Sequence, residues 1–269
     1  MSANRVWDIL LNACREPKPE GFGETLLGIA CDIGMEMMIC GAEIGRVEDA
    51  AARICMAYGA ADVHVFSITY SILVTLQLPG EPMFTQSRRV DRFAYDLHRL
   101  NRLNALSRRL CAQTPPLGTA REALEAIRAS GGPGRGRILA AYAMISAAFA
   151  IFFGGSPLDA AAAGLIGLAL FGIEKTFAGI AISPFFRPCV GAFCAGVLAG
   201  LAAKGLPVCQ MDKISIGNIM VLIPGLMITN SFREMFSNNL LSGSVRFLES
   251  VLIALAIAVG MALAWALVF

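Results

Sequence analysis

Residues 216–234 combine an apolar stretch with polar groups that could bind a solute inside a membrane. Its candidate path residues are Pro224, Gly225, Thr229, Asn230 and Arg233. Proline removes a backbone donor and clashes with the preceding turn, so a spanning helix is expected to kink or break at Pro224. The predicted chemistry is non-covalent: free backbone, hydroxyl and amide groups that hydrogen-bond a polar solute, and a guanidinium that attracts a carboxylate.

Two interpretations of this stretch stay open. In the first, the break at Pro224 and Gly225 forms a hinge or half-helix end, and Asn230 and Arg233 line a path through the membrane. In the second, the stretch is a kinked packing helix, and Arg233 marks its cytoplasmic rim, where cationic side chains commonly extend toward water. Under either interpretation, Arg233 is expected at the inner mouth and Asn230 deeper.

A second polar cluster lies in residues 41–54. Its charged members are Glu43, Arg46, Glu48, Asp49 and Arg53. Pairs spaced three or four residues apart can meet on one face of a helix. Because solvated pairs contribute little stability, the density of charge indicates an interface or a fixed polar network.

Composition predicts a membrane protein in two pieces. Of 269 residues, 56% are apolar and 16% are charged, and the mean hydropathy is +0.64. A soluble globular protein carries roughly 25% charged residues. Residues 1–137 hold 16 of the 22 Lys and Arg and 15 of the 20 Asp and Glu. The net charge of +2 gives no argument for nucleic-acid binding.

Residues 1–130 are predicted to form a cytoplasmic α+β domain, followed by a glycine-rich linker at 131–137. Helical periodicity and breakers predict a short piece at Val6–Cys14 and helices at Phe22–Cys40, Gly45–Tyr58, Asp91–Cys111 and Thr119–Ser130. Thr119 and Glu122 have the spacing of a capping box. Three antiparallel strands are predicted at Val63–Ser67, Ser71–Leu78 and Met83–Arg88.

Residues 138–269 are predicted to form an α-helical membrane domain with about five transmembrane helices. The expected spans are 138–155, 159–175, 184–203, 214–232 and 247–269, with an interfacial segment at Thr176–Ile182. Gly196 and Gly200 have the GxxxG spacing that permits close helix approach. The sequence therefore predicts a helical bundle in a lipid bilayer with an N-terminal α+β domain.

The distribution of Lys and Arg predicts the orientation. Seven such residues flank the spans on the side of the N-terminal domain, and two, Lys204 and Lys213, lie in the opposite loops. The positive-inside rule then places the N-terminal domain in the cytoplasm and the C-terminus outside, in a bacterial inner membrane. The Pro-Gly-x-x-x-Thr-Asn stretch has no second copy within this chain, so the chain is expected to form a homo-oligomer or to act with a small membrane partner subunit.

No metal, cofactor or enzyme activity is predicted. The eight cysteines show no CxxC pair, and Cys31, Cys40 and Cys55 fall on apolar helical faces as structural residues. His64 and His98 stand alone. A membrane-tethered hydrolase is the weakest alternative, because the sequence has no nucleophile elbow, zinc motif or phosphate loop.

The motifs together resemble the threonine/serine exporter family. The resemblance rests on Gly41-Ala42-Glu43, Arg46-Val47-Glu48, Arg53, Arg88-Arg89-Val90, Asn101-Arg102-Leu103, Ser107-Arg108-Arg109, Pro224-Gly225, Thr229-Asn230, Arg233-Glu234 and Leu241-Ser242-Gly243. It implies a cytoplasmic domain on a five-span membrane half and, in the split form of the family associated with succinate export, the larger of two subunits. The chain departs from the family at Ser67-Ile68-Thr69-Tyr70, where a strand turn often reads Thr-Pro-Thr-Gly.

The expected function is export of a small polar solute, either a threonine/serine-type amino acid or a dicarboxylate such as succinate. In this interpretation Thr229 and Asn230 hydrogen-bond the solute and Arg233 attracts its carboxylate. The alternative is a membrane-anchored cytoplasmic sensing or regulatory module whose spans mainly bind a partner.

Overall fold

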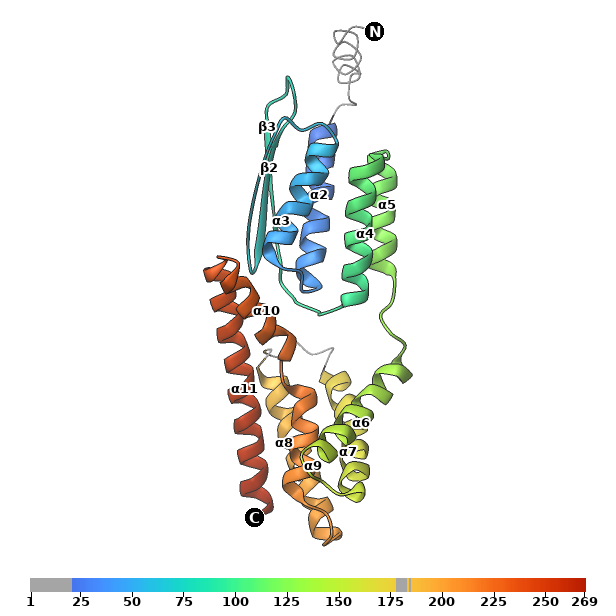
Figure 1. The fold of residues 1–269 in the computed structure, drawn as a ribbon, viewed down its shortest axis with the longest axis vertical. Coiled ribbons are helices and arrows are strands. Elements are labelled where there is room, and N and C mark those ends of the chain that lie inside the picture. Colours follow the sequence, from blue (N-terminus) through green and yellow to red (C-terminus); the bar gives the residue numbers. More distant parts are fainter. Residues whose placement is uncertain (1–20, 178–182, 184) are drawn as a thin grey trace. The chain divides into compact units, whose positions relative to one another are not determined.

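The computed structural model describes residues 21–177, 183 and 185–269 (Figure 1). Two compact units are present. The first holds the residues up to Gly132 together with Phe236–Ser242, and the second holds Pro133–Met235 with Gly243–Phe269. The predicted helical piece at Val6–Cys14 lies outside the described residues, as does most of the predicted interfacial segment at Thr176–Ile182.

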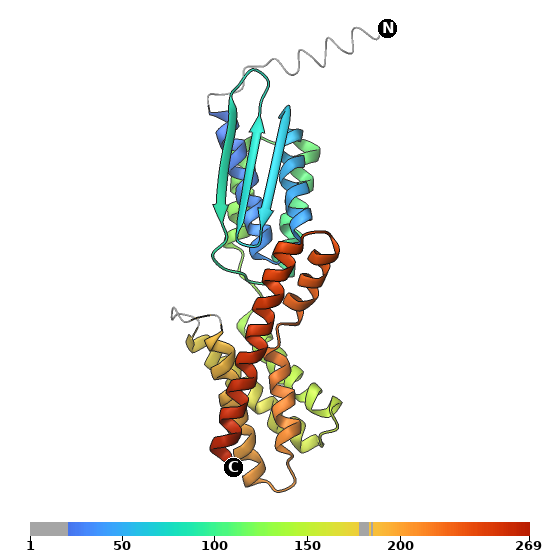
Figure 2. The same ribbon diagram turned by 90° about the vertical axis from the view of Figure 1, so that its left-hand side faces the viewer.

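The first unit has three layers. Its helices are α2 (Phe22–Ile39), α3 (Ile44–Ala57), α4 (Leu97–Gln113) and α5 (Leu117–Ala129), and its strands are β1 (Asp62–Ile68), β2 (Ser71–Gln77) and β3 (Met83–Arg89). The strands form an antiparallel sheet in the order β1-β2-β3, with Val65 opposite Val74 and Thr75 opposite Thr85. The sheet covers one side of α2 and α3, and α4 and α5 cover the other (Figures 1 and 2). The predicted small antiparallel sheet is confirmed.

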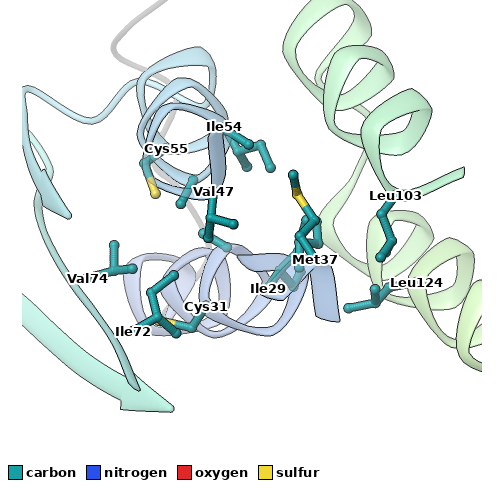
Figure 3. Close-up of a cluster of buried hydrophobic side chains, with 14 of the residues drawn as sticks. Ile29, Cys31, Met37, Val47, Ile54, Cys55, Ile72, Val74, Leu103 and Leu124 are labelled. Atoms are coloured by element: carbon teal, nitrogen blue, oxygen red, sulfur yellow. The ribbon is translucent and has the colours of Figure 1, made fainter. Parts of the chain in front are cut away.

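The core of this unit surrounds α2, which contacts both outer layers. Figure 3 shows Cys31 beside Ile72 of the sheet, whereas Met37 lies on the side of α2 nearer Leu103 and Leu124. All five side chains are buried. Successive strand residues face opposite sides of a sheet, so alternate residues of β2 turn inward to α2. Burial on two faces explains why α2 is apolar around most of its circumference.

The three predicted structural cysteines lie in this core as free thiols, and Cys14 is outside the described residues. Burial raises the pKa of Cys31 and Cys40 to about 11 and that of Cys55 to about 12. At pH 7.5 fewer than about one in a thousand of these thiols is ionised. We expect maleimide to label them in the detergent-unfolded chain and to spare them in the folded chain. Equal labelling rates in both states, measured by mass spectrometry of the peptides, would contradict this burial.

A buried carboxylate joins three helices of the first unit. Glu36 of α2 is 6% exposed. It forms ion pairs with Arg99 of α4 at 2.7 Å and with Arg128 of α5 at 2.9 Å. Arg128 also pairs with Glu125 at 2.7 Å. We call these four residues the Glu36 network. Removing one partner of a buried ion pair leaves the other charge uncompensated, so this network links the three helices.

Several helices begin elsewhere than the sequence predicts. Helix α4 starts at Leu97 and not at Asp91, because Ala94 donates its backbone hydrogen bond to Ile39 and the Asp96 side chain then caps the helix at 2.9 Å. Helix α5 starts at Leu117 directly after Pro116, so the predicted capping box at Thr119 lies inside the first turn. The first turn of α6 begins at Arg135, within the predicted linker.

The second unit is a bundle of apolar helices. These are α6 (Arg135–Phe152), α7 (Pro157–Phe177), α8 (Phe186–Gly205), α9 (Met211–Leu222), α10 (Gly225–Phe236) and α11 (Leu240–Val268). Within the described residues, four helices are long and apolar enough to cross a membrane, and α9 with α10 adds a fifth candidate as one bent pair. The second unit is therefore helical, with four to five candidate membrane spans among the described residues.

Small residues bring α8 and α11 close together. A Cβ atom added at Gly196 would lie 2.6 Å from Cβ of Ala264, and one added at Gly200 would lie 2.6 Å from Cγ1 of Val268. On the opposing helix, Gly260 faces the backbone carbonyl of Cys189. The GxxxG spacing thus marks a close helix contact, as predicted.

Candidate functional site

The candidate site is built around the break between α9 and α10. Their axes differ by 52°. Ile223 ends α9 in an extended conformation, because the ring of Pro224 disfavours helical geometry in the residue before it. Pro224 has no N–H to continue the ladder, and α10 restarts at Gly225 with the Ile228 amide bonded to the Pro224 carbonyl at 3.1 Å. The break predicted at Pro224 is confirmed.

The predicted polar residues all lie on α10. Thr229 and Arg233 are exposed and, four residues apart, share one face of the helix. The Thr229 hydroxyl donates its hydrogen to the Gly225 carbonyl at 3.0 Å, which leaves both lone pairs of the hydroxyl oxygen available to accept hydrogen bonds from a ligand. Asn230 is half-buried. The Thr229 hydroxyl and the Arg233 guanidinium therefore lie on the exposed face of α10. The Asn230 amide lies at the edge of this face.

The opposite face of α10 carries polar groups that the sequence analysis did not single out. Ser231 is fully buried and Glu234 is 2% exposed. Helix α10 packs against α11, where Gly243 approaches the Ser231 carbonyl and where Phe247 contacts Phe232 with ring centroids 5.4 Å apart. Ionisable side chains buried within membrane helices are costly and commonly functional. The signal available in the sequence was Glu234 itself, an acid at the end of an apolar stretch.

Further buried polar side chains lie on α6, α9 and α11. Arg246 of α11 is 3% exposed, and Asn218 of α9 is fully buried. The Asn218 side-chain amide donates to the Ile214 carbonyl at 2.9 Å. Helix α9 packs closely on α6, since a Cβ at Gly217 would lie 3.1 Å from the Ala150 amide nitrogen. The break is thus flanked by polar groups inside an apolar bundle, a pattern that sequence periodicity alone does not reveal.

The charged residues of the 41–54 cluster lie on or next to α3 in the first unit. Glu43 accepts a hydrogen bond from the Ser237 hydroxyl at 3.1 Å, and Glu48 accepts one from the Ser67 amide at 2.7 Å. Asp49 and Arg53 pair at 2.7 Å on the exposed surface. Two members therefore tie α3 to other segments of its unit, in keeping with a polar network.

Three members of the same cluster also line a cavity. Arg46, Asp49 and Arg53 border a space of about 440 Å³ between α3 and α4. Asn104, the buried Ser107 and Arg108 of α4 form the other side of its polar wall. Three guanidinium groups and one carboxylate give this surface a positive balance. It can accept an anion by charge-assisted hydrogen bonds.

Metal chemistry finds no support in the part of the chain that the structure describes. No group of three or more His, Cys, Asp or Glu side chains converges there as metal ligands. His64 pairs only with the exposed Asp62, at 3.1 Å.

Comparison with known proteins identifies a family for nearly the whole chain. Residues 28–268 match the ThrE family model, that of the threonine/serine exporters. No match was found among curated proteins or among solved structures. The matched region includes α3, the three strands and the α9–α10 break.

Proposed function

The chain belongs to the threonine/serine exporter family, a family of membrane transporters, and we propose that the α9–α10 break lines its export path. The break at Pro224 carries this proposal, because interrupted helices expose unpaired backbone groups that bind solutes and ions at the centre of many transporters. The solute is a small polar metabolite, either a threonine/serine-type amino acid or a dicarboxylate such as succinate.

The side chains of α10 supply the complementary chemistry. Thr229 and Asn230 hydrogen-bond the polar groups of the solute, and Arg233 attracts its carboxylate. The exposed face that holds Thr229 and Arg233 is available to a water-filled path or to a second membrane protein. Glu234 is buried on the other face of this helix.

A second membrane subunit is expected to complete the export path. Transporters are commonly built from two related halves around a central site. The described residues contain a single bent helix pair. We propose that a small separate membrane subunit, or a second copy of this chain, supplies the other half. The lysine and arginine count supports an inner-membrane location with the first unit in the cytoplasm and the C-terminus outside.

Export assays with substitutions on α10 test the site. Arg233→Ala and Asn230→Ala are each expected to lower efflux of the transported solute about tenfold, because the first removes a contact with the carboxylate and the second removes a hydrogen bond to a polar group of the solute. Lys213→Ala is the matched control, since its ammonium pairs only with the adjacent Asp212 at 3.3 Å. Normal efflux at normal membrane levels for both α10 variants would rule out this site.

The cavity lined by Arg46, Arg53 and Arg108 favours a second candidate function. In this alternative the first unit is a cytoplasmic sensing module that binds an anionic metabolite, and the spans mainly bind a partner. Loss of regulation with unchanged basal export, in a chain lacking residues 1–130, would favour this alternative.

A further inference from the structure

A charged cavity lies within the second unit, at the end of the bundle where α6 begins, α7 ends and α8 begins. Its volume is about 550 Å³, within the range of small-molecule sites. Its polar lining is provided by Tyr142, Glu174, Lys175 and Arg187. None of these residues belongs to the α10 site.

An acid is held in place on one wall of this cavity. The Tyr142 hydroxyl donates a hydrogen bond to the Glu174 carboxylate, and both side chains are half-buried. Phe171 packs edge-on against the Tyr142 ring, with centroids 5.6 Å apart. An ionised carboxylate has about four acceptor positions, so one bond from Tyr142 leaves others for a ligand. The hydrogen bond from Tyr142 therefore orients the Glu174 carboxylate, and the remaining acceptor positions of that carboxylate can still bind a cation.

Two cations face the same space from the neighbouring helix ends. Arg187 lies half-buried in the first turn of α8, and Lys175 is exposed in the last turn of α7. Lys175 has no ion-pair partner among the residues that the structure describes. The cavity thus offers two positive groups and one negative group beside the apolar surfaces of Ile138 and Pro188.

We propose that this cavity binds the zwitterionic headgroup of a small α-amino acid before it enters the path. Arg187 and Lys175 receive the α-carboxylate, and Glu174 receives the α-ammonium. The apolar wall contacts the amino acid side chain. Tyr142 is a positioning residue that acts through Glu174.

The same charges disfavour a dicarboxylate. A dicarboxylate would place its second anionic group near Glu174, which repels it, and it has no ammonium to offer that acid. This inference rests on the proposed export function. Of the two solutes proposed there, it favours the amino acid over the dicarboxylate.

Equilibrium binding of radiolabelled serine to the full-length chain in lipid nanodiscs tests the site. We expect Glu174→Gln and Arg187→Gln each to weaken serine binding about tenfold or more, because each removes a charge-assisted hydrogen bond. Glu174→Asp should restore part of the affinity. Lys175→Gln, whose side chain is exposed, should weaken binding about threefold without disturbing packing. Asp212→Asn is the control, because Asp212 lies in the first turn of α9 and does not line the cavity. This variant should bind serine as the unaltered chain does.

Two outcomes would overturn the inference. One is serine affinity within twofold of the unaltered chain for the Glu174, Arg187 and Lys175 variants, and the other is tighter binding of succinate than of serine. Export measured in the native host separates this failure from failure of the proposed function. Serine export that persists unchanged in Glu174→Gln removes the cavity site and leaves the exporter, whereas absence of solute export by the unaltered chain contradicts the function itself.

Discussion

Replacement of Glu36 by alanine is expected to destabilise the first unit by about 3 kcal/mol. The substitution removes the carboxylate that pairs with Arg99 at 2.7 Å and with Arg128 at 2.9 Å. These arginine side chains are only 21% and 24% exposed, so their charges would remain partly out of water without their main partner. Glu125 would still pair with Arg128, which sets the expected effect at the lower end for a broken buried pair.

Hydrogen exchange of the α2 amides measures this effect on the full-length chain. The free energy of opening of α2 should fall in Glu36→Ala, since α2 is the helix that the Glu36 network joins to α4 and α5. Glu122→Ala is the matched control, because Glu122 is exposed on α5 and forms no ion pair within the described residues. Equal protection of α2 in the unaltered chain and in both variants would show that the network contributes no net stability.

The regular elements of the first unit could be predicted because their patterns are local. The alternation of Ile72, Val74 and Leu76 predicts β2, and the helical spacing of apolar residues predicts α2. The start of α4 could not be predicted in this way. It depends on a backbone hydrogen bond between Ala94 and Ile39, which are distant in sequence.

The candidate site could be predicted only where it depends on local sequence. Pro224 breaks a helix through its own covalent structure, so the break is visible in the sequence. The bond between Tyr142 and Glu174 joins residues 32 positions apart on two helices, and the Glu36–Arg128 pair spans 92 positions. Such pairs form only when the helices pack. Local sequence patterns therefore do not predict them. Glu234 was visible as a residue, but its burial depends on how the helices pack.

The break itself offers the most direct test of the export path. Pro224→Ala restores a backbone N–H and removes the ring that clashes with the preceding turn, so it favours one continuous helix through α9 and α10. A continuous helix has no free backbone groups at its centre and no change of direction, and both features are assigned to the path here. We therefore expect Pro224→Ala to lower solute export at least tenfold, which corresponds to about 1.4 kcal/mol or more in the rate-limiting barrier.

The decisive measurement is the initial rate of threonine efflux from preloaded cells of the native host that lack their own copy and express the unaltered chain, Pro224→Ala or Gly172→Ala at equal membrane levels. Gly172 is the control because a Cβ there meets no neighbouring atom within 4 Å. The account predicts efflux by the unaltered chain and Gly172→Ala and at least tenfold slower efflux by Pro224→Ala. Efflux at the unaltered rate through the Pro224→Ala chain would contradict it.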